Sequence, residues 1–249
     1  MMPSIIKISV VIVTYNAAKA LKSAIESYLK QDYENKELVI IDGGSKDGTL
    51  TIINKFKDKI DYCVSEPDKG IYDAMNKGWK AATGDYIFYL GADDVLLDGG
   101  LAILGNAATG EDIIYGDIKI NKGYGVIMDY RCTLPISEIC NRPVYSHQSV
   151  IMKRQLLEKL NGFNCKYKIL ADYDLELRAY ISGATTKYVP GFIALYSMGG
   201  FSAYNPKSAK ERLMIQLTNK HTAHPYFIYY KTIVRKKFHY IASLIIGRK

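Results

Sequence analysis

The chain has 249 residues, which is room for one large domain or two small ones with a buried core. Its content of 48% hydrophobic and 23% charged residues excludes a disordered, collagen-like or coiled-coil chain. No apolar run approaches the roughly 18 residues of a membrane span, and residues 10–13 are too short for a signal-peptide core. The four cysteines form no CxxC pair, so we expect neither a zinc site nor a disulfide framework, and a reducing compartment fits.

Positive charge is concentrated near the C-terminal end. The whole chain carries 33 Lys and Arg against 25 Asp and Glu, a formal net charge of +8. Residues 206–249 contain ten of the basic residues and one acid, Glu211, so the preceding residues are close to neutral. A basic tail of this kind is a candidate for binding an anionic surface, either a membrane or a nucleic acid.

The first part of the chain alternates between strand and helix patterns. Residues 7–13 are a continuous, mostly β-branched run, typical of a strand that is buried on both faces. The same reasoning predicts further strands at 37–41, 61–64 and 86–90, and helices at 17–29, 49–56 and 71–82. This alternation with short connections predicts an α/β fold with a doubly wound, mostly parallel sheet flanked by helices.

From about residue 111 the spacing between elements loosens. We expect strands at 113–117, 125–130 and 186–196 and a helix at 172–181. No repeat or low-complexity linker occurs before residue 205. The chain is therefore predicted to form one domain over residues 1–205, followed by a basic helical tail over residues 206–249 that is not an independent domain.

Polar side chains follow three of the predicted strands. They are Thr14, Tyr15 and Asn16 after the first strand, Asp42 after the second, and Asp93 and Asp94 after the fourth. Each acid alone could be a helix cap or a turn former. Open α/β sheets bind ligands beyond the carboxyl ends of their strands, and here three strand ends agree. The sequence therefore predicts a binding site at this edge.

The adjacent carboxylates of Asp93 and Asp94 repel each other, and a divalent cation would offset that cost. Oxygen ligands suit Mg²⁺ or Mn²⁺, with phosphate oxygens completing the shell. A solvated acidic turn is the alternative. No GxGxxG motif follows the first strand and no GxxxxGK[ST] motif occurs, which disfavours dinucleotide-binding and P-loop proteins.

Five segments resemble, in the same order, the motifs of glycosyltransferase family 2. They are SVVIVTYN (9–16), VIIDGGSKDGT (39–49), SEPDKGIYDAMNKG (65–78), TGDYI (83–87) and LGADD (90–94). The resemblance extends over about residues 7–200 and is strongest to the bacterial branch that builds cell-surface polysaccharides. It implies a GT-A fold and an inverting transfer of sugar from a nucleotide-sugar donor.

The resemblance also implies a role for each matching residue on the donor side. Thr14, Tyr15 and Asn16 would line the nucleotide pocket, Asp42 would accept a hydrogen bond from the uracil ring, and Asp68, Asp73 and Asn76 would lie beside the base and ribose. Asp94 would be the main ligand of Mn²⁺ or Mg²⁺, with Asp93 nearer the ribose. The segment GGFS (199–202) resembles the family's flexible loop near the donor phosphates.

On the acceptor side, His147 and Gln148 with the strand that follows them resemble the family's acceptor segment. The run KILADYDL (168–175) matches the segment of the catalytic base, which places the base at Asp172. A helix N-terminus favours the ionised carboxylate, and one base suffices if the leaving group is a metal-stabilised diphosphate. A helix cap is the alternative role for Asp172, and Glu176, Asp174 and His147 are rival bases.

A helix from about residue 226 to 245 is expected to follow Pro225. Its apolar side chains fall near one face with Lys and Arg on the flanks: Phe227, Tyr230, Val234, Phe238, Ile241 and Ile245. Such a helix suits an anionic membrane surface. Packing on the body or on a second copy, as in a homodimer, is the alternative. We expect no nucleic-acid partner, because no binding motif for one occurs.

The predicted function is metal-dependent transfer of sugar from a nucleotide sugar, expected to be UDP-linked, to a glycan or lipid-linked acceptor. The expected location is cytoplasmic, with peripheral attachment to the inner face of the plasma membrane as an extension. One alternative is a sugar-phosphate nucleotidyltransferase, whose Gly-rich loop after the first strand is missing at residues 13–16. The other is a non-catalytic nucleotide-sugar-binding module, which would lack the base or the metal acids.

Overall fold

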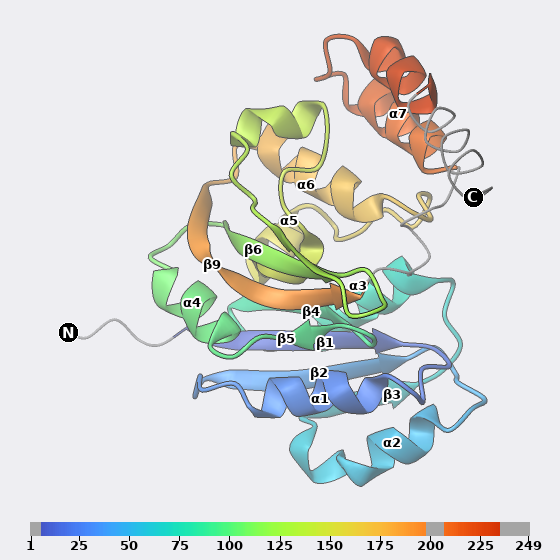
Figure 1. Ribbon diagram of the computed structural model, residues 1–249, viewed down its shortest axis with the longest axis vertical. Helices are drawn as coiled ribbons and strands as arrows, with labels where there is room; N and C mark the ends of the chain where they lie inside the picture. The colour runs from blue at the N-terminus through green and yellow to red at the C-terminus, as the bar shows by residue number, and fades with distance from the viewer. Residues whose placement is uncertain (1–5, 198–206, 235–249) are drawn as a thin grey trace.

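The computed structural model describes residues 6–197 and 207–234 (Figure 1). One sheet runs through the molecule in the strand order β3-β2-β1-β4-β8-β6-β9-β5, with β7 beside β6. The strands are β1 (Ile8–Thr14), β2 (Lys36–Asp42), β3 (Tyr62–Ser65), β4 (Tyr86–Gly91), β5 (Val95–Leu96), β6 (Ile113–Asn121), β7 (Ile127–Tyr130), β8 (Val150–Lys153) and β9 (Thr186–Ser197). Strands β1 to β4 are parallel, as is the β6–β9 pair, and the remaining pairs are antiparallel.

Helices cover both faces of the sheet (Figure 1). They are α1 (Leu21–Leu29), α2 (Thr49–Lys55), α3 (Ile71–Ala81), α4 (Gly100–Ala107), α5 (Arg154–Lys159), α6 (Ala171–Ile181) and α7 (Ser208–Asn219), with short 3₁₀ turns at Lys57–Lys59, Ile136–Cys140 and His147–Ser149. Successive residues of β1 point to opposite faces. Val11 joins the core with Met75 of α3, whereas Val10 joins the core with Ile25 of α1. The predicted α/β class with a helix-flanked sheet is confirmed.

Several predicted boundaries differ from the structure. Helix α1 begins at Leu21 and not at residue 17, because the chain turns at Asn16, whose φ is +50°, and Ala17 accepts backbone bonds from Ala20 and Leu21 before the helix begins. Strand β6 continues to Asn121, four residues beyond its predicted end. The elements β5, α4, α5 and α7 carried no prediction from periodicity, because most are too short to show one.

A buried carboxylate joins the amino ends of the first parallel strands. Glu37 on β2 accepts hydrogen bonds from Ser9 on β1 and from the backbone amides of Thr83 and Gly84, which precede β4, and Lys7 pairs with it at 2.6 Å. Although burial opposes ionisation, these bonds lower the pKa of Glu37 to about 2. A charge that is buried and fully partnered in this way holds the three strands in register with one another.

At the opposite ends, the register places the first residues of the predicted site side by side. Thr14 on β1 pairs with Asp42 on β2, and Val13 pairs with Gly91 on β4. The chain segments that follow these strands therefore leave the sheet at one edge, as the sequence predicted.

Helix α7 is held against the body by its polar side chains. The Glu211 carboxylate accepts the backbone amides of Lys168, Ile169 and Leu170, which directly precede α6, at 2.8–3.0 Å. Ile215 is buried in the same core as α6. After α7 the chain forms a further helical segment over residues 225–234, where the described part ends.

Two sequence predictions reach beyond the described residues. The glycine-containing loop at 199–202 lies entirely outside them, and so does the tail helix after residue 234. Within the described ranges, no helix combines the length and the apolar character needed to cross a membrane.

Candidate active site

A cavity of about 780 Å³ lies at the carboxyl ends of β1 and β4. Thr14, Tyr15 and Asn16 line it from the end of β1, Asp68 from the segment before α3, and Asp93 from the turn after β4. The Tyr15 ring is 63% exposed there. The Thr14 hydroxyl is buried without a hydrogen-bond partner among the described residues. With Asp47, which also lines it, the cavity offers an aromatic face, an unsatisfied hydroxyl and three carboxylates to a ligand.

Asp42 lies behind the wall of this cavity. Its carboxylate is fully buried and accepts hydrogen bonds from the backbone amides of Gly44 and Ser45 and from the Ser65 hydroxyl. Asn16 completes the same turn, since its amide donates to the Ser45 hydroxyl at 2.8 Å. Asp42 therefore shapes the turn from within the protein, and it is not among the side chains that line the cavity.

The three residues predicted beside the base and ribose separate into two groups. Asp68 lines the cavity, and its carboxylate accepts the Gly70 amide at 2.8 Å. Asp73 stabilises the start of α3 by accepting the Lys69 amide. Asn76 points to the interior, where its side chain exchanges two hydrogen bonds with the backbone of Phe163. Only Asp68 of these three lines the cavity.

The two acids after β4 lie between this cavity and β9, which is the last strand of the sheet along the chain. Asp93 is exposed, whereas Asp94 is buried and accepts the Ser197 amide of β9 at 2.9 Å. Burial, reinforced by the charge of Asp93, raises the pKa of Asp94 to about 6 against the opposing effects of Ser197, His147 and Gln148. Gly91 is required below this pair, because a Cβ there would lie 2.5 Å from Asp94 Oδ2.

These two carboxylates fit a divalent cation as part of a shared coordination shell. A carboxyl whose ionised form is disfavoured by burial and by a neighbouring acid gains when a cation binds beside it. Within residues 6–197 and 207–234, no cluster of three or more His, Cys, Asp or Glu could enclose a metal. The protein part of such a site would therefore be Asp93 and Asp94, and phosphate oxygens suit the remaining positions.

A second, smaller cavity of about 260 Å³ lies beyond the acid pair. His147, Gln148, Asp172 and Glu176 contribute its polar lining. Its other walls are largely aromatic and aliphatic: Ile118, Ile120, Tyr130, Tyr145, Leu170, Tyr173 and Tyr196. His147 lines this second cavity, and it is close enough to Asp94 for its charge to affect the pKa of that acid.

Asp172 lies in the first turn of α6, as predicted, and is held from two sides. One carboxylate oxygen lies 3.3 Å from His147 Nδ1. The other accepts the Tyr173 amide at 2.8 Å and lies 3.3 Å from the Tyr72 hydroxyl, which donates to the Ile169 carbonyl at 2.8 Å. Burial disfavours the imidazolium form of His147, but the hydrogen bond and charge of Asp172, with that of Asp94, raise the pKa of His147 above its ordinary value. Asp172 is thus a partly exposed carboxylate, oriented by two neighbours and open to the second cavity.

Comparison with known proteins matches residues 9–162 to the family model described as glycosyl transferase family 2. A PGL/p-HBAD biosynthesis glycosyltransferase of Mycobacterium bovis is 34% identical over 206 residues, which are 78% of each chain. The chain belongs to glycosyltransferase family 2. The resemblance found in the five sequence motifs is thereby confirmed.

Solved structures show the same fold. TarS of S. aureus, residues 1–349 in complex with UDP-GlcNAc, matches with a TM-score of 0.67 and 20% identity over 84% of this chain and 64% of that one. A mannosyltransferase from Pyrobaculum calidifontis, in complex with GDP-Man and Mn²⁺, matches with a TM-score of 0.64 and 19% identity over 92% of this chain and 64% of that one. This chain therefore spans less than two thirds of either solved chain, and it shares their GT-A fold.

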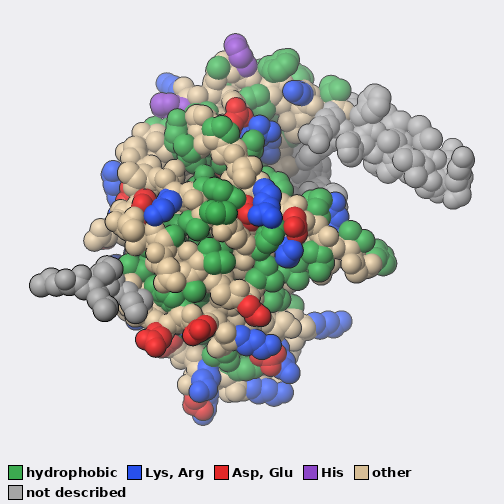
Figure 2. All heavy atoms as spheres, turned by 60° about the vertical axis from the view of Figure 1, so that its left-hand side comes forward, with side chains coloured by type: hydrophobic (Ala, Val, Ile, Leu, Met, Phe, Trp, Pro, Cys, Tyr) green, Lys and Arg blue, Asp and Glu red, His purple; other side chains and the backbone are tan. Residues whose placement is uncertain are grey.

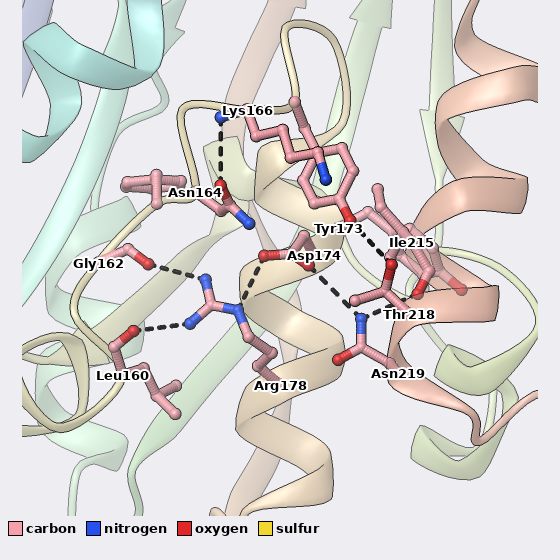
Figure 3. A network of polar contacts seen from close by, with 12 residues as sticks. Leu160, Gly162, Asn164, Lys166, Tyr173, Asp174, Arg178, Ile215, Thr218 and Asn219 are labelled. Carbon is pink, nitrogen blue, oxygen red and sulfur yellow. Dashed lines mark hydrogen bonds and ion pairs between the residues drawn. The ribbon is translucent and has the colours of Figure 1, made fainter.

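Within this family 2 domain, the structure distinguishes between the rival bases. Asp174 is buried and committed to a network that joins α6 to α7 and to the loop after α5 (Figure 3). It pairs with Arg178 at 2.8 Å, and Arg178 also donates to the carbonyls of Leu160 and Gly162. Glu176, by contrast, lines the second cavity one helical turn after Asp172, on the face that its spacing predicted.

Three residues of the site carried no sequence prediction. Tyr72 orients Asp172, Tyr145 lines the second cavity, and Ser197 anchors Asp94. Tyr72 lies within one of the family-like segments, and Tyr145 lies two residues before His147, so proximity to these motifs was the only available signal. Ser197 is 103 positions from Asp94 and carried no signal.

The pairing of His147 with Asp172 predicts a change in titration. Because the Asp172 carboxylate stabilises the imidazolium, we expect the pKa of His147 to fall in the Asp172→Asn variant. An NMR titration of the histidine ring signals measures this, with His147→Gln to identify the resonance. His221 and His224, on the segment after α7, serve as internal controls that should not move. An unchanged pKa of His147 would show that the two side chains do not interact in solution.

Proposed function

We propose that the chain is a metal-dependent, inverting glycosyltransferase that moves a sugar from a nucleotide sugar to an acceptor hydroxyl. The observation that carries this proposal is a chain of interactions between the two cavities: Asp172 in the second cavity pairs with His147, and the charge of His147 acts on Asp94, which follows Asp93 in the lining of the larger cavity. One cavity is large enough for a nucleotide sugar and is lined by Asp93, the first acid of the pair after β4. The other contains an oriented carboxylate for proton removal.

The donor is proposed to bind in the larger cavity as a UDP-sugar. Tyr15 offers a ring for stacking, Thr14 an unsatisfied hydroxyl, and Asp68 a carboxylate at the edge. Asp42, Asp73 and Asn76 would support the donor through the turns and helix that they stabilise. A contact between Asp42 and uracil would have to replace one of its internal hydrogen bonds. The complexes of the two solved relatives with UDP-GlcNAc and GDP-Man support a nucleotide-sugar donor.

Asp94 and Asp93 would hold Mn²⁺ or Mg²⁺ against the diphosphate. When bound, the cation would neutralise charge on the departing diphosphate. The protein contributes by fixing Asp94 through the Ser197 amide, so that this carboxylate is positioned before the donor arrives. The Mn²⁺ in the Pyrobaculum relative supports this proposal.

Asp172 would act as the general base. As the acceptor oxygen bonds to the anomeric carbon, its proton passes to the Asp172 carboxylate, and the bond from carbon to diphosphate breaks on the opposite side. This single displacement inverts the anomeric configuration. His147 and Tyr72 each lie 3.3 Å from one of the two oxygens of Asp172, which orients this carboxylate in the first turn of α6. Gln148 would line the acceptor side with His147.

The acceptor is proposed to be a glycan or a lipid-linked glycan of the cell surface. The largely aromatic and aliphatic walls of the second cavity suit the apolar face of a sugar ring. The name of the M. bovis relative, a PGL/p-HBAD biosynthesis glycosyltransferase, supports a role in a biosynthetic glycosylation. The reaction would then take place in the cytoplasm, at the inner face of the membrane.

The helical segment over residues 225–234 supports attachment to such a membrane. Tyr226, Phe227, Tyr230 and Val234 are 58–68% exposed, so these side chains do not pack on the described body. The tail around them is rich in Lys and Arg. On the face of the body in Figure 2, basic and acidic side chains are interspersed. Aromatic groups beside basic ones suit an anionic lipid surface, and a second copy of the chain is the alternative occupant.

Removing the base should abolish transfer without disturbing donor binding. We expect Asp172→Asn to lower kcat by roughly 100-fold or more, the scale of a lost general base, because the amide keeps the shape but cannot accept the proton. UDP release from the donor with acceptor present measures this, together with UDP affinity. Glu158→Gln, an exposed acid on α5, is the matched control. A near-normal kcat in Asp172→Asn would move the role to Glu176 or His147.

Removing the buried acid should remove the effect of metal on UDP binding. We expect Mn²⁺ to tighten UDP binding in the unaltered chain but not in Asp94→Ala, and Asp98→Ala to behave as the unaltered chain. Because the pKa of Asp94 is about 6 without a cation, protonation should weaken the Mn²⁺ effect as the pH falls below that value. Calorimetric titration with Mn²⁺ or EDTA measures both. Equal UDP affinity of the unaltered chain in Mn²⁺ and in EDTA would contradict the metal assignment.

Shortening the chain after His224 should remove vesicle binding and leave the catalytic body intact. We expect the full chain to co-sediment with vesicles that contain phosphatidylglycerol, and less so at high salt, because each basic residue near an anionic surface contributes about 1 kcal/mol. Phe227→Ala and Lys231→Gln should each weaken binding. Absence of vesicle binding, together with a dimer that is lost on shortening, would assign the tail to a second copy.

A further inference from the structure

Two buried polar groups among the residues that line the second cavity have no hydrogen-bond partner within the described part of the chain. Glu176 is 5% exposed and Tyr145 is 4% exposed, and both line this cavity. Glu176 Oε2 and the Tyr145 hydroxyl are buried without a hydrogen bond to any residue that the structure describes. We call these two groups the polar floor of the second cavity. Buried polar groups are normally bonded, so an unsatisfied pair that lines a cavity indicates a missing ligand group.

Neighbouring polar groups of the same cavity are already used. The Tyr173 hydroxyl donates to the Cys140 carbonyl, and the Ser146 hydroxyl donates to Gln148 Oε1. Asp172 is held by His147 and Tyr72. Among the described residues that line this cavity, the polar floor therefore holds the buried side-chain atoms that have no hydrogen-bond partner.

The chemistry of the polar floor favours an uncharged ligand. Burial, with the nearby charge of Asp172, raises the pKa of Glu176 well above its ordinary value, and burial also raises that of Tyr145. A neutral carboxyl has one O–H donor and one carbonyl acceptor, and a phenol can donate and accept. This pair complements a hydroxyl group, which also donates and accepts. A carboxylate or phosphate would place a second negative charge beside Asp172, in a cavity with no Lys or Arg among its lining residues.

The position of the polar floor relative to Asp172 fits a sugar ring. Glu176 follows Asp172 by four residues on α6, so the two lie about 6 Å apart along the helix axis. A pyranose can present one hydroxyl to Asp172 and another to Glu176 across such a distance. Tyr130 and Tyr196 line the same cavity and offer rings for its apolar face.

We propose that Glu176 and Tyr145 select an uncharged sugar ring in the acceptor by binding one of its hydroxyls, different from the hydroxyl that attacks. The inference rests on the proposed transferase function and adds the class of acceptor. It assigns Glu176 to acceptor binding and leaves proton removal to Asp172. An acceptor ring that carries a carboxylate at this position would be rejected.

The binding test uses matched methyl glycosides in the presence of UDP and Mn²⁺. Methyl glucoside, galactoside and mannoside are titrated against the methyl uronides of the same three sugars, with ligand-observed NMR as the readout. We expect at least one neutral glycoside to bind and its uronide to bind roughly tenfold more weakly, because the uronide leaves a buried charge unpaired. Absence of binding by all three neutral glycosides, or equal binding of the uronide, would overturn the proposal.

Variants then assign the effect to the polar floor. Glu176→Gln keeps a donor and an acceptor and should change the affinity for the neutral glycoside by about twofold at most, whereas Glu176→Leu and Tyr145→Phe should lower it about fivefold or more. Glu158→Gln is the control for loss of an acid elsewhere. Tyr145→Phe removes only one oxygen, so it still tests the polar floor if Glu176→Leu does not fold. Unchanged affinity in Tyr145→Phe would contradict the proposal.

Donor chemistry is measured in the same variants. UDP affinity and slow hydrolysis of the UDP-sugar without acceptor should be unchanged in the control Glu158→Gln, while KM for a glycan acceptor rises in Tyr145→Phe. If hydrolysis and UDP binding are absent from the unaltered chain, the transferase proposal fails irrespective of the glycoside result. A loss of kcat in Glu176→Gln as large as that expected for Asp172→Asn would make Glu176 the base and overturn the assignment made here.

Discussion

The buried carboxylate of Glu37 fixes the register of β1, β2 and β4, the strands on which the site depends. It binds Ser9 on β1 and the amides before β4, and Lys7 neutralises it. A slip of one residue would turn the apolar side chains of a strand to the wrong face, and a slip of two would leave a charge buried without partners. Because strands are stiff, alignment at the amino ends sets the alignment of Thr14, Asp42 and Gly91 at the other ends. Glu37 therefore affects the geometry of the larger cavity from about 20 Å away, which is the length of the seven-residue strand β2.

The site itself depends on contacts between segments that are far apart in the chain. Ser197 at the end of β9 holds Asp94, and Tyr72 at the start of α3 holds Asp172. His147 pairs with Asp172 at 3.3 Å, and the charge of Asp94 also acts on it. Each of the proposed steps, cation binding and proton removal, thus uses a carboxylate whose orientation is fixed by a different part of the fold. Preorganisation of this kind allows the charges to act without rearrangement during the reaction.

The parallel half of the sheet could be predicted because each of its strands is a long apolar run bounded by polar residues, as in residues 8–14. The motifs likewise placed Asp93 and Asp94 beside one cavity and Asp172 in another. Strand β5 and helix α5 are too short for a periodic signal, so only tertiary packing defines them. Residue type alone also could not show that Asn76 points inward to Phe163 or that Asp42 is saturated by its own turn, because both depend on side-chain direction.

The Glu211 carboxylate also determines how far the chain can be shortened. It satisfies three backbone amides that directly precede α6, and Asp172 follows the last of them by two residues. A deletion that begins before residue 211 would remove this cap and leave three donors unsatisfied at the start of α6. The smallest unit in which the site keeps its shape therefore includes α7. In a fragment that ends near residue 205, a loss of activity would result from displacement of Asp172. It would not show that the tail binds a membrane.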